Sequence, residues 1–181
     1  MNSVLYDQQW FETALPELEL YHVSRAVKVK RDLRYDITIM PAQMLGKEFA
    51  KTKGNRNSNG FQELYTVLEG NAIFLMQKTN NAIVEDVKAV KAEKNDWVIV
   101  PPDYLVITIN SSTVKELKTG NWVSEKTENI YKDVEKFNGA CWFYTKKGWV
   151  KNKNYKKNPE LRFEKSLKQI PKSLEFLRTK H

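Results

Sequence analysis

The amino-acid sequence predicts an all-β (mainly β) fold, a sandwich or barrel built from short strands. Short apolar runs rich in Val, Ile, Leu and aromatic residues recur between residues 18 and 144. Turn residues separate these runs, and the Asn80-Asn81 pair is typical of a hairpin between two strands. No long segment of helical periodicity interrupts the series. Many short strands without long helices indicate a sandwich or a barrel.

The elements follow in order along the chain. Residues 6–15 suit a short helix that ends at Pro16, because proline cannot continue a helix. Predicted strands then cover residues 18–30, 35–41, 62–68, 72–78, 83–91, 96–100 and 106–110, with later strands at Trp122 and at 140–144. Residues 159–180 carry apolar side chains at a spacing that suits one or two short helices interrupted by Pro171.

A length of 181 residues is that of one domain with a substantial core. We therefore expect a single domain over residues 1–181, with an N-terminal extension (1–17), a β-barrel (18–145) and a basic, partly helical C-terminal extension (146–181). No segment approaches the ~20 apolar residues of a membrane span. The first residues lack the basic start and apolar run of a signal peptide, so we expect a cytoplasmic protein.

Cysteine and histidine are scarce, which excludes several kinds of site. Cys141 is the single cysteine, so neither an internal disulfide nor a cysteine-based zinc site can form. It lies in an apolar, aromatic run, which predicts a buried thiol. His22 and His181 are the only histidines, so a Ser-His-Asp or Cys-His catalytic centre is not expected.

Positive charge is concentrated in the C-terminal segment. Residues 146–181 hold twelve Lys and Arg against three Glu, a net charge of +9, whereas the whole chain carries +8. Residues 1–145 therefore carry a net charge of −1. A basic segment with interleaved aromatic residues can bind nucleic acid or another polyanion. No nucleic-acid-binding signature accompanies the charge, so we favour an ordinary lysine-rich surface and expect no nucleic-acid partner.

Residues 46–70 hold the most informative pattern of the chain. Gly46, Asn55, Asn57, Glu63 and Gly70 have the spacing of the first cupin motif, in which a His-x-His pair stands at the two asparagine positions. Residues two apart on a strand share a face, so Asn55 and Asn57 can point into a barrel together. Imidazole suits transition metals, whereas amide oxygen suits harder cations and binds weakly alone.

Residues 95–110 resemble the second cupin motif, with Pro-Pro between two apolar strands. The closing histidine of that motif corresponds to Val106. Three of the four metal ligands that the motifs imply are therefore absent, and Glu63 alone remains. We expect no metal and no cofactor at this site, because zinc or iron usually takes three or more protein ligands.

The chain resembles the cupin-type phosphoglucose isomerases over about residues 17–132. The matching segments are Ile37-Thr38-Ile39, Gly46-Lys47-Glu48-Phe49, Thr52-Lys53-Gly54, Glu63-Leu64-Tyr65 and Leu68-Glu69-Gly70, extended by residues 98–102. The resemblance implies a cupin fold, which is a double-stranded β-helix or jelly-roll barrel, here with short N- and C-terminal helices. It also implies that Asn129 stands at a histidine position of the family, and Leu18, with Tyr21 nearby, at a tyrosine that contacts phosphate.

The resemblance further implies the roles of several residues. Thr38, Thr52 and Gly54 would hold the phosphate of a sugar, and Glu63 would be the base that moves a proton between C2 and C1. Tyr65 lies two residues after Glu63, so it should share the face of Glu63 and line the pocket.

Hydrogen bonds would have to replace the metal in such a site. Lys53, Asn55 and Asn57 are the residues that we expect to supply them to the developing oxyanion. Structural interpretations stay open for the same residues. Glu63 can be a buried acid held by amide, Tyr or Lys partners, Lys53 a solvated side chain, and Tyr65 a core residue.

Three functions stay open on the sequence alone. The first is an isomerase with a degenerate metal site that interconverts glucose-6-phosphate and fructose-6-phosphate. The second is a catalytically inactive protein that binds a phosphorylated sugar and reports or regulates. The third is a polyanion binder that uses the basic C-terminal segment. As partners we expect a small phosphorylated sugar and no membrane, and the resemblance implies a homodimer paired through edge strands.

Overall fold

The computed structural model describes residues 4–14 and 18–180, so Pro16, the predicted end of the first helix, lies outside the described residues. The prediction of a mainly β fold is confirmed, because strands dominate the described chain. Two short α-helices occur in it, α1 (Gln8–Thr13) and α2 (Lys132–Lys136). Helix α1 was predicted, whereas no pattern in the sequence had indicated the five-residue helix α2.

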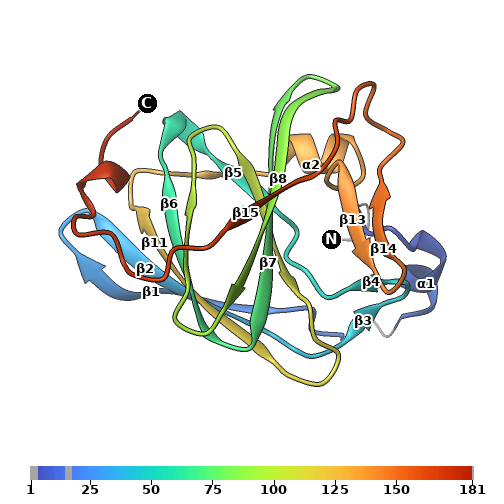
Figure 1. The fold of residues 1–181 in the computed structure, drawn as a ribbon, viewed down its shortest axis with the longest axis horizontal. Coiled ribbons are helices and arrows are strands. Elements are labelled where there is room, and N and C mark those ends of the chain that lie inside the picture. The colour runs from blue at the N-terminus through green and yellow to red at the C-terminus, as the bar shows by residue number, and fades with distance from the viewer. Residues whose placement is uncertain (1–3, 15–17, 181) are drawn as a thin grey trace.

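Two large sheets form the body of the molecule (Figure 1). The first contains, in spatial order, β1 (His22–Lys30), β2 (Leu33–Met40), β11 (Leu117–Ser124), β6 (Glu63–Glu69) and β9 (Trp97–Val100). The second contains β12 (Asn129–Ile130), β5 (Asn55–Asn57), β10 (Leu105–Asn110), β7 (Asn71–Asn80), β8 (Ile83–Glu93) and β15 (Arg162–Lys165). Within the described strands of these two sheets, neighbours in sequence pair as antiparallel hairpins only at β1–β2 and β7–β8, so most pairs join distant segments.

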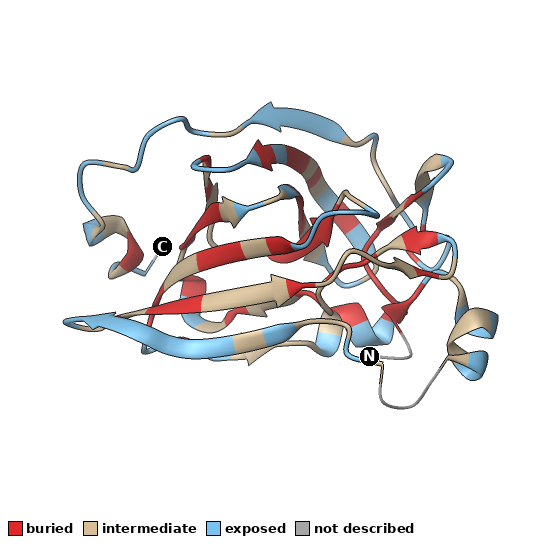
Figure 2. Ribbon diagram, turned by 90° about the horizontal axis from the view of Figure 1, so that it is seen from below, coloured by how far each residue is buried: buried red, intermediate tan, exposed pale blue. Residues whose placement is uncertain are grey.

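Apolar side chains of both sheets meet in the interior. One core cluster joins Val67 of β6 to Phe74 of β7 and Val106 of β10, and strand β10 is buried along its whole length. Figure 2 shows this pattern, with buried residues between the layers and exposed residues on the outermost strands. Strand β1 is exposed at nearly every position because it lies at the edge of its sheet. Burial of the inner faces stabilises the barrel at about 25 cal/mol per Å² of apolar surface.

A third, smaller sheet closes one end of the barrel beside α1 (Figure 1). It consists of β14 (Gly148–Lys151), β13 (Trp142–Thr145), β4 (Glu48–Phe49) and β3 (Met44–Leu45). Buried Glu48 accepts a hydrogen bond of 2.7 Å from the Tyr6 backbone N–H, and the Lys51 amine donates to the Val4 carbonyl at 2.9 Å. These contacts hold the chain before α1 against the barrel.

The C-terminal segment differs from its prediction. Arg162–Lys165 forms strand β15, which pairs in parallel with β8, where a helix had been expected. Only the 3₁₀ turn η3 (Glu175–Leu177) is helical between residues 159 and 180. Free backbone groups along the edge of β8 account for the difference, because a neighbouring segment can pair with them regardless of its own helical periodicity.

Two further expectations can be compared with the structure. Cys141 is completely buried, as predicted, and burial raises the pKa of its thiol. Among the described residues, the helices are too short to cross a membrane. The predicted strand at 18–30 begins only at His22, and Trp122 lies inside the longer strand β11.

Candidate functional site

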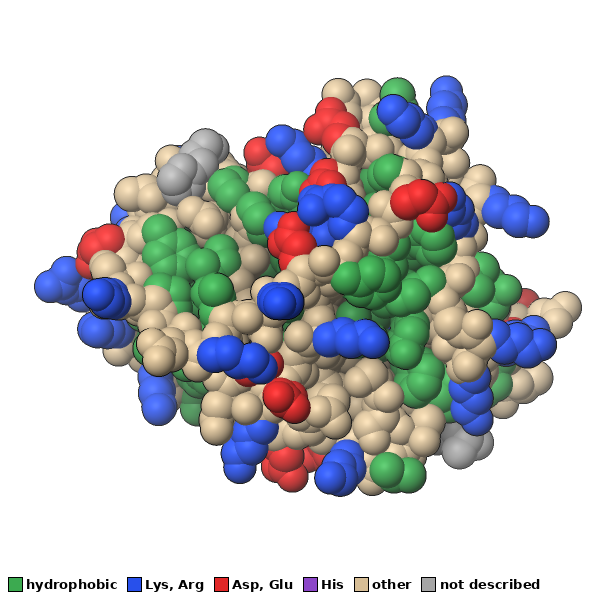
Figure 3. Space-filling model, in the orientation of Figure 1, with side chains coloured by type: hydrophobic (Ala, Val, Ile, Leu, Met, Phe, Trp, Pro, Cys, Tyr) green, Lys and Arg blue, Asp and Glu red, His purple; other side chains and the backbone are tan. Residues whose placement is uncertain are grey.

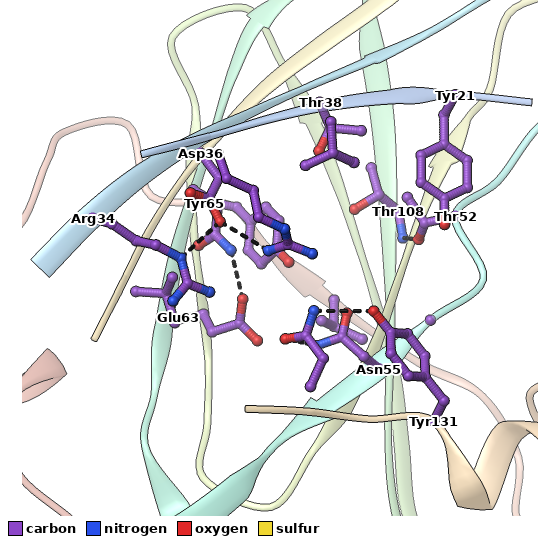
Figure 4. A pocket seen from close by; sticks show the side chains of 17 residues that line it. Tyr21, Arg34, Asp36, Thr38, Thr52, Asn55, Glu63, Tyr65, Thr108 and Tyr131 are labelled. Atoms are coloured by element: carbon purple, nitrogen blue, oxygen red, sulfur yellow. Dashed lines mark hydrogen bonds and ion pairs between the residues drawn. The ribbon is translucent and has the colours of Figure 1, made fainter. Parts of the chain in front are cut away.

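A pocket opens between the two large sheets, and its wall contains most of the predicted site residues. We call it the Glu63 pocket. Its lining includes Thr38, Thr52, Gly54, Asn55, Glu63 and Tyr65. Figure 4 shows acidic and basic side chains on one side of the pocket and the hydroxyls of Tyr21, Thr38 and Thr52 on the other. One part of the wall is therefore charged and the other carries neutral hydrogen-bonding groups.

Strand β2 supplies a row of three polar side chains to this wall. Arg34, Asp36 and Thr38 all line the pocket, and they stand two residues apart. Alternate residues of a strand project to the same face, which explains why all three reach the pocket. The same alternation on β6 brings Glu63 and Tyr65 to the pocket together, as predicted.

Asp36 is a buried anion with cationic and backbone partners. Its carboxylate accepts hydrogen bonds from the Arg34 Nε at 3.1 Å, the Arg25 Nη1 at 3.3 Å and the Ala26 backbone N–H at 2.8 Å. Ala26 has a φ of 52° at an irregularity of β1, which turns this N–H toward Asp36. The two arginines and Asp36 together leave one positive charge at the pocket before Glu63 is counted.

Glu63 is held by an amide on the neighbouring strand. The Asn121 Nδ2 of β11 donates to the Glu63 Oε2 at 2.6 Å, while the Glu63 Oε1 has no hydrogen-bond partner. Burial raises the pKa of the Glu63 carboxyl, and the Asn121 hydrogen bond, the interaction with the Tyr65 hydroxyl and the charge of Arg34 oppose this rise. A carboxyl with a raised pKa is a stronger base than an ordinary carboxylate and is suited to take up a proton and return it.

Tyr65 completes this part of the wall. Its ring packs against Phe74 of the core, with 5.1 Å between the ring centroids. Burial, together with the nearby Glu63 carboxylate, raises the pKa of the Tyr65 hydroxyl well above its ordinary value. The hydroxyl therefore stays protonated and available as a hydrogen-bond donor.

The loop before β5 brings Thr52 and Gly54 to the pocket. The Thr52 hydroxyl accepts a hydrogen bond of 3.0 Å from the Thr108 backbone N–H of β10, which leaves its own proton free to be donated. Gly54 has a φ of +86°, and a Cβ at this position would lie 2.4 Å from the Ile107 Cγ1. Only glycine fits here without movement of the loop or of β10.

A chain of hydrogen bonds forms the wall on the side of β5 and β12. The Asn55 Nδ2 donates to the Asn129 Oδ1 at 3.2 Å, and the Asn129 Nδ2 donates to the Tyr131 hydroxyl at 3.1 Å. Two of the positions that the resemblance assigns to histidines of the family, Asn55 and Asn129, thus bond to each other in this chain.

The structure does not bring two of the predicted residues to the pocket lining. The Lys53 amine forms an ion pair with Glu135 of α2 and lies 4.8 Å from the centroid of the Tyr131 ring. Asn57 is buried, with 4% of its surface exposed, at the end of β5 where the 3₁₀ turn η2 (Ser58–Gly60) begins. Of the three residues expected to replace the metal, Asn55 alone lines the pocket.

Sequence reasoning missed several residues of the pocket wall. Arg34 and Asp36 carried a signal, since they precede Thr38 by four and two residues on one strand. Arg25, Thr108 and Asn121 carried none, because their places depend on which strands lie side by side. Asn121 faces Asp36 on β2 and Tyr65 on β6 in the sheet register, and no local pattern indicates that pairing.

The donor groups of the pocket do not fit a transition metal. No cluster of three or more His, Cys, Asp and Glu that could hold a metal ion occurs in the described parts of the chain. Val106 lines the pocket where the second motif would place a histidine, and Asp36 is already paired with two arginines. Glu63 therefore remains as the single free carboxylate, too few donors for zinc or iron.

Comparison with known proteins identifies a family for most of the chain. Residues 7–160 match the model of the family described as Glucose-6-phosphate isomerase (GPI). Comparison with curated proteins finds no match. Among solved structures, an oxalate oxidase in complex with the substrate analogue glycolate is similar with a TM-score of 0.51 and 8% identity, over 69% of this chain and 60% of that one.

Another solved structure that the chain matches is a vicilin from Capsicum annuum. It has a TM-score of 0.44 and 12% identity, over 56% of this chain and 25% of the vicilin. The chain thus spans 60% of the oxalate oxidase and a quarter of the vicilin. Oxalate oxidase and vicilin are cupins, and at such identities the likeness to oxalate oxidase shows the fold alone.

Proposed function

Since this chain belongs to the cupin-type glucose-6-phosphate isomerase family, we propose that it binds a phosphorylated hexose in the Glu63 pocket and interconverts its aldose and ketose forms. The observation that carries the proposal is the buried environment of the Glu63 carboxyl. It is a buried carboxyl with a raised pKa, one oxygen held by Asn121 and the other without a partner. Such a group is suited to take up a proton and return it.

The pocket offers different chemistry to the two ends of such a ligand. Thr38 and Thr52 offer hydroxyl donors to the phosphate, and the positive φ of Gly54 lets the backbone approach closely. Arg34 and Arg25 add positive charge beside Glu63. In our proposal the phosphate lies on the side of the threonines and the reacting carbons lie next to Glu63.

The reaction consists of a proton transfer between two adjacent carbons. Glu63 takes the proton from C2 of the open-chain aldose, and the electron pair of that C–H bond forms the C1–C2 double bond of an enediolate. Glu63 then returns the proton to C1 while the hydroxyl proton of O2 moves to O1, which gives the ketose. The charge that develops on O1 is stabilised by Arg34 and by pocket hydrogen bonds, as fixed donors and charges do in other enzymes.

Calorimetric titration with glucose-6-phosphate tests the binding part of the proposal. We expect saturable binding, and Thr52→Val should weaken it about ten- to a hundredfold, because a lost hydrogen bond to a charged group costs about 1.5–3 kcal/mol. Thr52→Ser keeps the hydroxyl and should bind within a few-fold of the natural protein. Absence of binding to any hexose phosphate at millimolar concentration contradicts the proposal.

An isomerase assay tests the chemical part, with and without EDTA and added divalent metal. We expect turnover that EDTA does not abolish, and elemental analysis that finds no near-stoichiometric iron, nickel or zinc. Glu63→Gln should lower kcat at least about a hundredfold, the usual contribution of a general acid–base group, with ligand binding retained. Near-stoichiometric metal that Glu63→Gln releases would overturn the metal-independent form of the proposal.

A second candidate function is binding without turnover. The replacement of family histidines by Asn55, Asn57 and Val106 favours it, because a pocket can keep its ligand contacts after losing the groups that stabilise the developing oxyanion. Saturable binding of glucose-6-phosphate without isomerisation, in both the natural protein and Glu63→Gln, would identify this function. The protein would then report or regulate in response to a phosphorylated sugar.

A further inference from the structure

Two buried oxygen atoms next to the Glu63–Asn121 hydrogen bond have no partner among the described residues. One is the Oε1 of Glu63, the carboxyl oxygen that Asn121 does not bond. The other is the Oδ1 of Asn121, the oxygen of the amide whose nitrogen donates to Glu63. Both residues line the Glu63 pocket. Proteins seldom leave such atoms unsatisfied, because each one costs about 1–3 kcal/mol. A molecule that donates hydrogen bonds would be stabilised at these two atoms once a small side-chain movement opens them to the pocket, because both are buried in this structure.

We propose that Asn121 both positions Glu63 and recognises a hydroxyl of the bound sugar at C1 or C2. Its amide nitrogen holds the Glu63 Oε2 at 2.6 Å, and its amide oxygen accepts the hydrogen bond of that hydroxyl. This inference rests on the proposed function. It adds a residue, Asn121, that neither motif indicated, and it assigns to that residue the recognition of the reacting end of the ligand.

The chemistry of the two free atoms supports a diol over other ligands. An ionised carboxylate oxygen and an amide oxygen are acceptors only, so they require donors. In the cyclic form of the hexose, the adjacent C1 and C2 hydroxyls supply a donor to each of two neighbouring acceptors, and in the open-chain aldose the C2 hydroxyl supplies one. A cation is less suited to this place, because the Arg34 guanidinium already acts electrostatically on the Glu63 carboxyl.

An amide is also suited to a carboxyl that changes its protonation state. When Glu63 is ionised, the Asn121 nitrogen donates to it, as in this structure. When Glu63 carries the proton, rotation of the amide would let the Asn121 oxygen accept it. Asn121 can therefore hold Glu63 in the same place before and after the proton transfer. Neither Ala nor an aliphatic side chain can do so.

The test combines one variant with two altered ligands. Asn121→Ala and the natural protein are titrated calorimetrically with glucose-6-phosphate, with 2-deoxyglucose-6-phosphate and with 1,5-anhydroglucitol-6-phosphate. The second ligand lacks the C2 hydroxyl and the third lacks the C1 hydroxyl. We expect Asn121→Ala to weaken glucose-6-phosphate binding about tenfold, the usual effect of one hydrogen bond. For the analogue that lacks the recognised hydroxyl, the variant should cause no further loss.

A pH profile gives a readout that a merely structural role of Asn121 would not change. The Asn121 hydrogen bond lowers the pKa of Glu63, so its removal should shift the rise of kcat/KM to higher pH. Where the protein binds without turnover, the pH dependence of affinity takes the place of kcat/KM. Asn129→Ala removes an amide of the same size from the opposite wall and should leave the midpoint of the profile unchanged.

The outcomes separate this inference from the proposed function. Equal loss of affinity for all three ligands in Asn121→Ala, or an unshifted pH profile, overturns the role of Asn121 while the proposed function stands. If the natural protein binds no hexose phosphate, the proposed function itself is contradicted, and the role of Asn121 falls with it. Where Asn121→Ala does not fold by circular dichroism, Asn121→Ser is titrated instead with the same expectations.

Discussion

Glu63 is a residue whose environment penalises its charged form. Its side chain is 3% exposed and burial raises the pKa of its carboxyl, although Asn121 and Arg34 favour the ionised state. A structural acid would be expected to have both oxygens satisfied, yet its Oε1 has no partner among the described groups. The cost of such an arrangement is more easily explained by a function of the carboxyl than by a contribution to stability.

We predict that Glu63→Gln changes the pH dependence of stability. Because the pKa of Glu63 is higher in the folded than in the unfolded state, the favourable contribution of its protonated form is complete below the ordinary Glu pKa of about 4.3 and is lost as pH rises through the folded-state pKa. Glutamine has no proton to lose. Relative to the natural protein, the variant should therefore gain free energy of unfolding as the pH rises from 4 to 8.

Urea unfolding of both proteins at several pH values measures this difference. Glu48, whose pKa burial also raises, is common to both and cancels in the comparison. A variant that loses free energy of unfolding relative to the natural protein as the pH rises would show that the ionised form of Glu63 is stabilised in the fold, against the stated direction.

Thr52 serves the fold as well as the proposed ligand. Its hydroxyl accepts the hydrogen bond of the buried Thr108 backbone N–H at 3.0 Å. We predict that Thr52→Val lowers the free energy of unfolding by about 1–3 kcal/mol, because valine leaves this N–H without a partner. Thr52→Ser is the matched control and should be near the natural protein in urea unfolding. Equal stability of Thr52→Val and Thr52→Ser would contradict the structural role.

At the scale of elements, the loop before β5 depends on Gly54. A Cβ at Gly54 meets Ile107 of β10, whereas a Cβ at Gly148, also at positive φ, meets nothing within 4 Å. We predict that Gly148→Ala lowers the free energy of unfolding by about 1–2 kcal/mol through backbone strain alone. Gly54→Ala should lower it by about 1–3 kcal/mol more, because its Cβ also clashes with Ile107. Urea unfolding of the two variants measures the difference. Similar losses would mean that the loop moves without cost.

The C-terminal segment is attached to the barrel by a strand and by one buried side chain. Strand β15 pairs with β8, and Leu177 of η3 is completely buried beside Leu33 and Leu64. We predict that Leu177→Ala lowers the free energy of unfolding by about 2–5 kcal/mol through the cavity that it leaves. Phe163→Ala on β15, where the side chain is 58% exposed, should cost about 0.5 kcal/mol or less. The same urea titration tests both, and equal effects would contradict the docking of η3.

At the scale of the whole molecule, we propose that the described chain unfolds as one domain. The two large sheets share one interior, and the C-terminal segment pairs along the edge of β8 and ends in the cluster around Leu33. Tryptophan fluorescence and far-ultraviolet circular dichroism should therefore report the same urea midpoint. Separate midpoints would show that the C-terminal segment unfolds independently of the barrel.

The surface offers little support for binding of a polyanion. Figure 3 shows Lys and Arg side chains dispersed over one face of the molecule, with acidic and apolar groups between them. Four of the C-terminal cations, Lys151, Arg162, Lys168 and Arg178, form ion pairs within the fold. The homodimer stays a prediction, and the exposed edge strand β1 is the segment through which two chains would pair.

Local pattern was sufficient for most of the barrel and part of the site. Strands such as β6, β7 and β8 were predictable from runs of apolar residues and turn residues, which are properties of adjacent positions. Spacing within β6 predicted that Glu63 and Tyr65 share a wall. Asn55 and Val106, which the resemblance assigns to metal-ligand positions, both line the pocket, whereas Asn57 does not.

Sheet register decided the remainder, because it places residues side by side that are distant in sequence. Asn121 reaches Glu63 across 58 residues only because β11 pairs with β6, and Arg162–Lys165 became a strand because the edge of β8 was open to it. The Lys53 amine forms an ion pair with Glu135 of α2, a helix that no pattern in the sequence had indicated. The free energy of such contacts depends on which segments the folded chain brings together, and that information is not contained in the spacing of residues along any one strand.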